Sequence, residues 1–208
     1  MRENRMTTTA KRSLVKQQKI LEMAAKLFLK NGYEGVSVDE VTRAAGGSKT
    51  NVYTYFGGKE GLFIAVVEYL MADALQPFKA LKVSDHPPEQ ALKELGRTFL
   101  DIILGEHLLA LHRLIVAESA RFPQLGQAWF AAGPEYVYRS VEAYLEAQQR
   151  VGRLRPGNPR RAAALFLDMM TFDVHHRTLL GVTPRPGQAE LERLIEDAVD
   201  TFLHGYMP

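Results

Sequence analysis

The side chains best suited to chemistry in this sequence are hydrogen-bond donors gathered between residues 37 and 59. Hydroxyls, an amide, two phenols and two lysines follow one another in and around the stretch KTNVYTYF. Donors of these kinds suit phosphate oxygens and base edges, so the stretch predicts contact with a nucleic acid. The candidate contact residues are Ser37, Ser48, Lys49, Thr50, Asn51, Tyr53, Thr54, Tyr55 and Lys59.

Two short helices joined by a glycine turn must position these donors. Ser37 followed by Glu40 predicts a capping box, so the first helix begins directly after Ser37. Gly46-Gly47 ends that helix, and Ser48 precedes a second helix over residues 49–55. This arrangement is typical of proteins that place a recognition helix in the major groove. An ordinary helical hairpin explains the stretch equally well when it is taken alone.

The sequence offers little for catalysis or metal binding. It has no cysteine, no phosphate-binding glycine loop and none of the common nucleophile or zinc motifs. His107 and His112 lie five residues apart and His175 and His176 are adjacent, so neither pair has the i, i+4 spacing of metal ligands on a helix. We expect packing or surface histidines, no metal, no cofactor and no enzymatic activity, although carboxylates brought together by folding would leave no local pattern.

Charge separates the two parts of the chain. Residues 1–60 carry 11 Lys/Arg against 6 Asp/Glu, whereas residues 61–208 carry 15 against 18. A basic segment attached to a mildly acidic remainder suits a nucleic-acid-binding module, and solubility alone also explains it. The absence of cysteine, of a long apolar run and of a signal-peptide pattern favours a cytoplasmic protein.

The segment ILEMAAKLFLKNGYEGVSVDEVTRAAGGSKTNVYTYFGGKEGLF closely resembles the DNA-binding domain of the TetR family of transcriptional regulators. The resemblance covers roughly residues 13–65, with many motif positions in register. It implies binding to double-stranded DNA at a palindromic operator, a homodimer, and a body with a pocket for a small apolar effector. Most members of this family are repressors.

Three features depart from the family pattern. Gly47 replaces a valine or isoleucine that pins the turn, which predicts a looser turn. Asn51 and Thr54 replace a common threonine and a common histidine or asparagine, which changes the expected operator sequence. Gly57-Gly58 removes a good cap from the next helix and is either a hinge or a simple loop.

The rest of the chain reads as helices, so we expect an all-α fold. We predict a flexible basic arm over residues 1–12, a helix-turn-helix DNA-binding domain over 13–60, and a larger helical effector-binding and dimerisation domain over 61–208. One long helix over residues 59–81 is expected to join the two domains.

The body resembles the effector domains of regulators similar to AefR. That resemblance rests on RFPQL, AGP and GRLR at their relative spacings. Methionine and aromatic side chains line adaptable apolar pockets, although most such residues are plain core. The candidates for ligand contact are Phe63, Phe99, Phe122, Trp129, Phe130, Tyr144, Met169, Met170 and Phe172.

An apolar stripe near the C-terminus predicts the dimer interface, because a monomer would have little left to cover it. Its members are Leu191, Leu194, Ile195, Ala198, Val199 and Phe202. Together these features predict a homodimeric, ligand-responsive repressor with DNA, a second copy of the chain and a small molecule as partners, and no membrane. The alternative is an all-helical interaction module that does not bind DNA.

Overall fold

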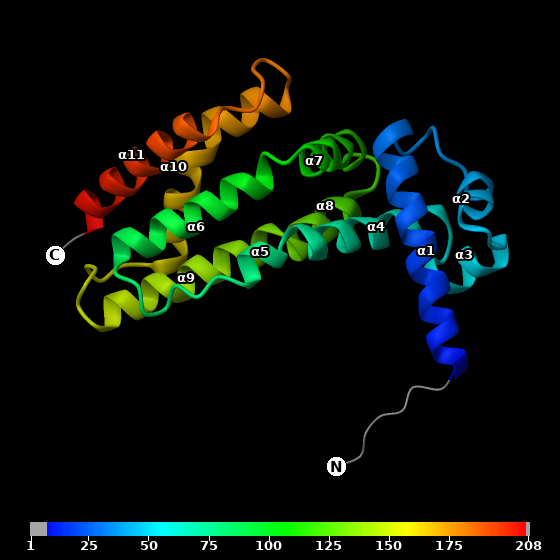
Figure 1. Ribbon diagram of the computed structural model, residues 1–208, viewed down its shortest axis with the longest axis horizontal. Coiled ribbons are helices and arrows are strands. Elements are labelled where there is room, and N and C mark those ends of the chain that lie inside the picture. The colour runs from blue at the N-terminus through cyan, green and yellow to red at the C-terminus, as the bar shows by residue number, and fades with distance from the viewer. Residues whose placement is uncertain (1–7, 207–208) are drawn as a thin grey trace, which may run out of the picture. The chain divides into compact units, whose positions relative to one another are not determined.

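The computed structural model describes residues 8–206, and over this range the chain forms helices joined by turns and loops, with no strand (Figure 1). The predicted all-α fold is confirmed. No helix in this range is long and apolar enough to cross a membrane. In chain order the helices are α1 (Thr8–Asn31), α2 (Val38–Ala45), α3 (Lys49–Phe56), α4 (Lys59–Ala74), α5 (Gln76–Lys79), α6 (Pro88–Ile103), α7 (Glu106–Glu118), α8 (Pro123–Ala132), α9 (Pro134–Arg150), α10 (Pro159–Leu179) and α11 (Gln188–Tyr206).

Two helix boundaries differ from the sequence prediction. Residues 8–12 of the expected flexible arm belong to α1, because nothing between Thr8 and Ser13 breaks a helix; residues 1–7 lie outside the described range. The helix expected over residues 59–81 ends at Ala74, and α5 follows with Pro77 in its first turn. Proline has no N–H and its ring clashes with the carbonyl four residues earlier, so it begins a new helix here.

The packing divides the chain into two compact units. The first unit contains residues 8–70 and 114–128, and the second contains residues 71–113 and 129–206. This division differs from the domain border predicted after residue 60. The helices α4, α7 and α8 each begin in one unit and end in the other.

An aromatic cluster forms the centre of the first unit. The Phe28 and Phe63 ring centroids lie 4.9 Å apart, and the Tyr33 centroid lies 5.1 Å from that of Phe63. The Tyr33 ring also packs against Phe122, with centroids 5.1 Å apart and the planes steeply inclined. Phe28 and Phe63 are almost completely buried. Aromatic pairs at these separations add to the stabilisation that burial alone provides.

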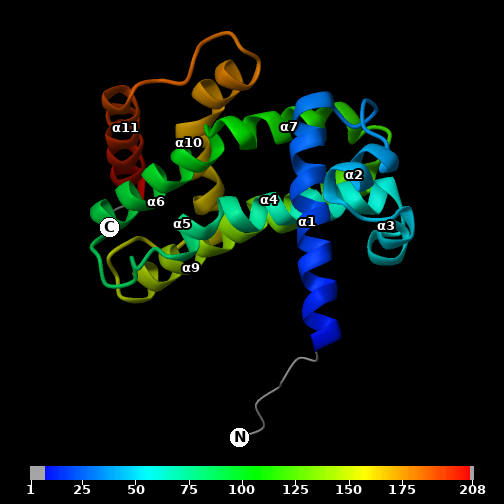
Figure 2. The ribbon, with the colours of Figure 1, turned by 45° about the vertical axis from the view of Figure 1, so that its right-hand side comes forward.

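The second unit is a bundle built mainly from α6, α9, α10 and α11. Helix α10 packs against α9 and α11 packs against α6, as Figures 1 and 2 show from two directions. Phe166 of α10 meets Phe202 of α11 at 5.3 Å. At Gly96 of α6 a Cβ atom would lie 2.7 Å from the Met170 sulfur, so the end of the Met170 side chain of α10 fills the space above this glycine.

A bidentate ion pair joins α6 to α11 inside this unit. Arg97 donates from Nε to one Glu192 carboxylate oxygen at 2.6 Å and from a terminal nitrogen to the other at 2.5 Å. These hydrogen bonds lower the pKa of Glu192 to about 2. The pKa of Glu192 is lower in the folded chain than in the unfolded chain. The ion pair therefore stabilises the fold fully when the pH is above the ordinary glutamate pKa, and this stabilisation is lost as the pH falls toward 2.

We predict that Glu192→Gln lowers the free energy of unfolding by about 0.5–1 kcal/mol at neutral pH, since the pair is partly exposed to solvent. The difference from the wild type should shrink as the pH falls from 4.5 toward 2. Urea denaturation at several pH values measures this. Glu190→Gln, at an exposed position on the same helix, is the matched control. If the loss of unfolding free energy in Glu192→Gln did not change with pH, the Arg97–Glu192 ion pair would not be its cause.

Candidate functional site

The helix-turn-helix begins with the predicted capping box. The Ser37 hydroxyl oxygen accepts from the Glu40 backbone N–H at 3.2 Å, and a Glu40 carboxylate oxygen accepts from the Ser37 N–H at 2.7 Å. These bonds lower the pKa of Glu40. The capping box is therefore confirmed, and it already occupies the hydroxyl of Ser37, which was predicted as a DNA contact.

Gly46 provides the turn between α2 and α3. Its φ of 67° lies in the left-handed region, and the Gly47 N–H donates to the Thr42 carbonyl at 2.9 Å. Gly47 does not have a positive φ, and a Cβ there would lie 3.7 Å from the Asn51 amide nitrogen, an ordinary contact. The turn geometry therefore depends on Gly46, whereas Gly47 could carry a side chain.

Helix α3 presents most of the predicted DNA contacts on its outer surface. Val52 is fully buried and fixes the inner face of the helix, while Asn51 is half-buried. Ser48 occupies the N-cap position, yet its hydroxyl makes no capping hydrogen bond. The exposed predicted contacts on and beside α3 are Ser48, Lys49, Thr50, Tyr53 and Thr54.

Two predicted contacts, Tyr55 and Lys59, are engaged inside the first unit. The Ser13 hydroxyl donates to the Tyr55 hydroxyl oxygen at 3.2 Å, which ties α3 to α1. The Lys59 ammonium lies 4.3 Å from the Tyr33 ring centroid and 4.0 Å from a Glu34 carboxylate oxygen. Burial lowers the pKa of Lys59. In this structure both residues hold the unit together.

Charged side chains of both signs surround α3. Lys49 pairs with Asp39 at 2.7 Å, and both side chains are more than half exposed, so a phosphate can compete for the lysine. Arg43 is exposed at the end of α2. The Lys19 ammonium of α1 lies beside the turn at Gly46, 3.8 Å from where a Cβ atom of that residue would be.

The junction between α3 and α4 is held by glycines. A Cβ at Gly61 would lie 1.8 Å from the Phe56 carbonyl oxygen, so only glycine lets the first turn of α4 pass the end of α3. Gly57 and Gly58 have φ values of 76° and 125°. A serine at position 58 would be strained at that φ and would not be a better helix cap than glycine.

Residues 114–128 belong to the first unit, which the sequence analysis did not predict. Arg121 forms an ion pair with Glu34, Gln124 donates to Glu60, and Phe122 packs on Tyr33. About ninety residues separate the partners of the first pair along the chain, so no local pattern signals the contact. Phe122, predicted to line an effector pocket, packs in this unit instead.

The other predicted ligand contacts fall in different environments. Phe63 is core of the first unit, Tyr144 donates its hydroxyl to the His86 carbonyl at 2.9 Å, and Met170 packs on Gly96. Phe99 is half-buried on α6. Three residues are exposed rather than enclosed: Phe130 by 49%, Met169 by 45% and Phe172 by 74%. Trp129 stacks on His112 with centroids 5.0 Å apart.

The predicted dimer stripe is covered within the chain itself. Leu194 is half-buried, and Leu191, Ile195, Ala198, Val199 and Phe202 are each at most 6% exposed. The expectation that a monomer leaves this stripe uncovered is wrong, because α6 and α10 pack against α11. Apolar residues that remain exposed on or just after α10 are Leu165, Met169, Phe172, Leu180 and Val182.

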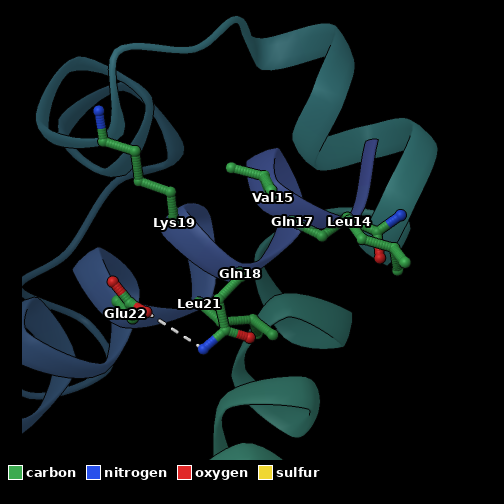
Figure 3. A pocket seen from close by; sticks show the side chains of 7 residues that line it. All are labelled: Leu14, Val15, Gln17, Gln18, Lys19, Leu21 and Glu22. Atoms are coloured by element: carbon green, nitrogen blue, oxygen red, sulfur yellow. Dashed lines mark hydrogen bonds between the residues drawn. The ribbon is translucent and has the colours of Figure 1, made fainter. Parts of the chain in front are cut away.

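Two surface hollows lie in different parts of the chain. One hollow, of about 480 Å³, lies beside α1, where Gln18 donates to Glu22 at 3.1 Å; Figure 3 shows the side chains that line it. Its lining residues are Leu14, Val15, Gln17, Gln18, Lys19, Leu21 and Glu22. Since all lie on one helix and point in different directions, they do not enclose a ligand. The other, of about 760 Å³, is an open groove beside α10, α11 and their connecting loop.

The histidines do not form a three-ligand metal cluster anywhere in the described part of the chain. His112 lies instead beside His175, with His112 Nδ1 and His175 Nε2 3.4 Å apart. The sequence analysis missed this pair because it joins α7 to α10 across 63 residues.

Comparison with known proteins identifies both parts of the chain. Residues 20–66 match the family described as bacterial regulatory proteins, tetR family. Residues 90–208 match the AefR-like transcriptional repressor C-terminal domain, which covers more than half of the sequence.

Individual relatives are also transcriptional regulators. The regulator RutR of Escherichia coli (strain K12) is 36% identical over 105 residues, 49% of each chain, so the match spans about half the length of this curated relative. A TetR-family crystal structure from Mesorhizobium loti MAFF303099 is 31% identical, with a TM-score of 0.80 over 95% of this chain and 99% of the other. The flavonoid-responsive regulator FrrA is 28% identical, with a TM-score of 0.82 over 93% and 97%.

We predict opposite effects of alanine at the two turn glycines. Gly46→Ala should destabilise the fold by about 1–2 kcal/mol, because alanine is strained at that left-handed φ. Gly47→Ala should stabilise it by about 0.4–1 kcal/mol by restricting the unfolded chain. Urea denaturation followed by circular dichroism measures both variants. Equal effects would show that the two glycines are not distinguished by backbone conformation.

Proposed function

This chain belongs to the TetR family of bacterial regulatory proteins, and from that premise we propose that it is a homodimeric transcriptional repressor released from operator DNA by a small apolar molecule. The observation that carries the proposal is the outer face of α3. Hydroxyl, phenol and ammonium groups line that face, while Val52 fixes the opposite face in the first unit.

Each exposed side chain of α3 suits one kind of DNA contact. Lys49 and Tyr53 suit phosphate oxygens, since they are exposed by more than half and their polar groups extend from the helix. Thr50, Asn51 and Thr54 suit base edges in the major groove. Phosphate contacts position the helix, and base contacts select the sequence.

Release of DNA requires that the effector favour a state that cannot bind the operator. An effector that binds this state ~100-fold more tightly supplies ~2.7 kcal/mol of coupling. The helices α4, α7 and α8 run continuously from one unit into the other and are the covalent route for this coupling. FrrA is described as flavonoid-responsive, which supports a small, largely apolar effector for this chain as well.

Dimerisation should use the exposed face of α10 in place of the buried stripe on α11. Leu165, Met169 and Phe172 follow one another at i, i+4 and i+7, so they share one side of the helix. They are 44%, 45% and 74% exposed, and the groove beside α10 and α11 continues from Met169. A second copy related by a two-fold axis would cover the same face on both chains and present two recognition helices to a palindromic operator.

We predict that Lys49→Ala weakens binding to all DNA sequences and reduces the dependence of log affinity on log salt by about 0.9. Asn51→Ala should instead change which operator is preferred. Genomic fragments selected by binding provide the operator, and fluorescence anisotropy at several salt concentrations measures affinity. Lys93→Ala on α6 is the control. If Lys49→Ala left both the affinity and its salt dependence unchanged, Lys49 would not contact DNA. If the wild-type chain bound no genomic fragment, the alternative of an all-helical interaction module without DNA binding would be favoured.

We predict that Met169→Glu combined with Phe172→Glu gives a folded monomer that no longer binds the operator, because charges would be buried against their symmetry mates. Sedimentation at micromolar concentration measures the oligomeric state, and circular dichroism checks the fold. Val151→Glu is the control, since Val151 is 66% exposed but follows α9. A dimer that survives the double substitution would exclude this face. Phe202→Glu is not a useful test, since Phe202 is only 1% exposed.

A further inference from the structure

One side of α1 carries a row of cations along most of its length. Successive members are separated by four, three, seven and four positions, so they share one face of the helix. The row, called here the α1 stripe, consists of five exposed residues: Arg12, Lys16, Lys19, Lys26 and Lys30. At 1.5 Å per residue it extends for about 27 Å.

The cations of the α1 stripe have no carboxylate partner. Among residues 8–206 none of the five forms an ion pair. The one acidic residue of α1, Glu22, accepts a hydrogen bond from Gln18 instead. Helices of the second unit differ, since Arg139 and Arg177 each pair at 2.7 Å with a carboxylate four residues away. A row of unpaired like charges does not favour the helix itself, so it indicates an anionic partner.

The N-terminal half of the α1 stripe lies beside the helix-turn-helix. The Ser13 hydroxyl donates to the Tyr55 hydroxyl oxygen of α3 at 3.2 Å, which fixes this part of α1 next to the recognition helix. The Lys19 ammonium lies beside the turn at Gly46, directly before α3. DNA held by α3 therefore passes close to this half of the stripe.

The first turns of α1 project beyond α3, as Figures 1 and 2 show from two directions. Residues 8–12, expected to be part of a flexible arm, are helical. Arg12 and Lys16 are therefore carried on a stiff support past the recognition helix. Cations fixed in this way lose less conformational freedom on binding than cations on a disordered arm.

A DNA duplex fits the α1 stripe better than a membrane surface does. Duplex phosphates form a regular row of charges, and they need no apolar contact. A membrane-bound helix requires a broad apolar face beside its cations. The apolar residues Ile20, Ala24 and Phe28 of α1 are instead buried in the first unit, and the exposed Leu14 and Val15 are too few to form such a face.

We propose that Arg12, Lys16 and Lys19 bind phosphates of the duplex outside the base pairs that α3 reads, so that the operator must extend beyond its two half-sites. This inference rests on the proposed function, since it requires that the chain bind DNA. Arg12 and Lys19 lie about 10 Å apart along the axis of α1, which gives room for more than one phosphate. Because phosphate contacts carry no base information, the sequence of the flanking duplex is not read.

The first test measures the salt dependence of operator binding by the full-length chain. Arg12→Ala combined with Lys16→Ala should lower the dependence of log affinity on log salt by about 1.8 for each bound chain, twice the ~0.9 of one phosphate contact. A fourfold rise in salt should then weaken the wild type about twelvefold more than the double variant. Fluorescence anisotropy measures affinity, and circular dichroism checks the fold.

The matched control is Lys26→Ala combined with Lys30→Ala, which removes the same charge from the same face but further from α3. It should leave the affinity and the salt dependence unchanged. An equal decrease in this control would overturn the proposal, because the effect would then reflect net charge alone.

The second test shortens the operator by removing base pairs outside the half-sites. At 0.1 M salt the wild type should lose at least about tenfold in affinity, whereas Arg12→Ala with Lys16→Ala should lose almost none, since its phosphate contacts are already absent. Lys49→Ala should retain the wild-type dependence on the flanks, because Lys49 lies on α3. If the double variant fails to fold, the response of the wild type to shortening decides.

Three outcomes would overturn the proposal. A wild type that binds the operator with no dependence on its flanks, and whose double variant keeps the full salt slope, would refute this inference alone. Binding to phosphatidylglycerol vesicles that the double variant loses, while its operator binding is unchanged, would assign the stripe to a membrane surface. A wild type that binds no duplex would refute the proposed function and this inference with it.

Discussion

The first unit depends on the ring of Tyr33. The ring contacts Phe63 and Phe122, and the Lys59 ammonium lies over it. Through this ring the start of α4, the end of α1 and the segment before α8 share one core. The position of α3 follows from that core, because Val52 packs inward and Gly61 lets α4 pass directly beneath the end of α3.

The same constraint explains why Lys59 is less accessible than its neighbours on α3. An ammonium over an aromatic face and beside a carboxylate gains interactions that a fully solvated lysine lacks. Partial burial makes the charged form less favourable, which is the cause of its lowered pKa. Any contact of Lys59 with a phosphate must replace these interactions, whereas Lys49 would give up only an exposed ion pair.

Local chemistry made part of this structure predictable from sequence. Ser37 and Glu40, three residues apart, form the capping box at the start of α2, and Gly46 ends that helix in a left-handed conformation that residues with a Cβ rarely adopt. Long-range packing was not predictable in this way. The apolar stripe of α11 looked like an interface because its cover, α6, lies about a hundred residues earlier in the chain. His112 and His175 are likewise brought together only by the bundle.

The two-segment composition of the first unit affects the order in which the protein can fold. Tyr33 and Glu34 leave the ribosome long before Phe122 and Arg121, their partners across about ninety residues. Domains commonly fold as units during synthesis, N-terminal part first. Here the N-terminal unit cannot complete its core until residue 128 has been made, and α6 of the second unit has been synthesised before then. A fragment that stops at residue 70 would lack Phe122, which packs on Tyr33, so simple truncation cannot isolate the recognition helix with its full support.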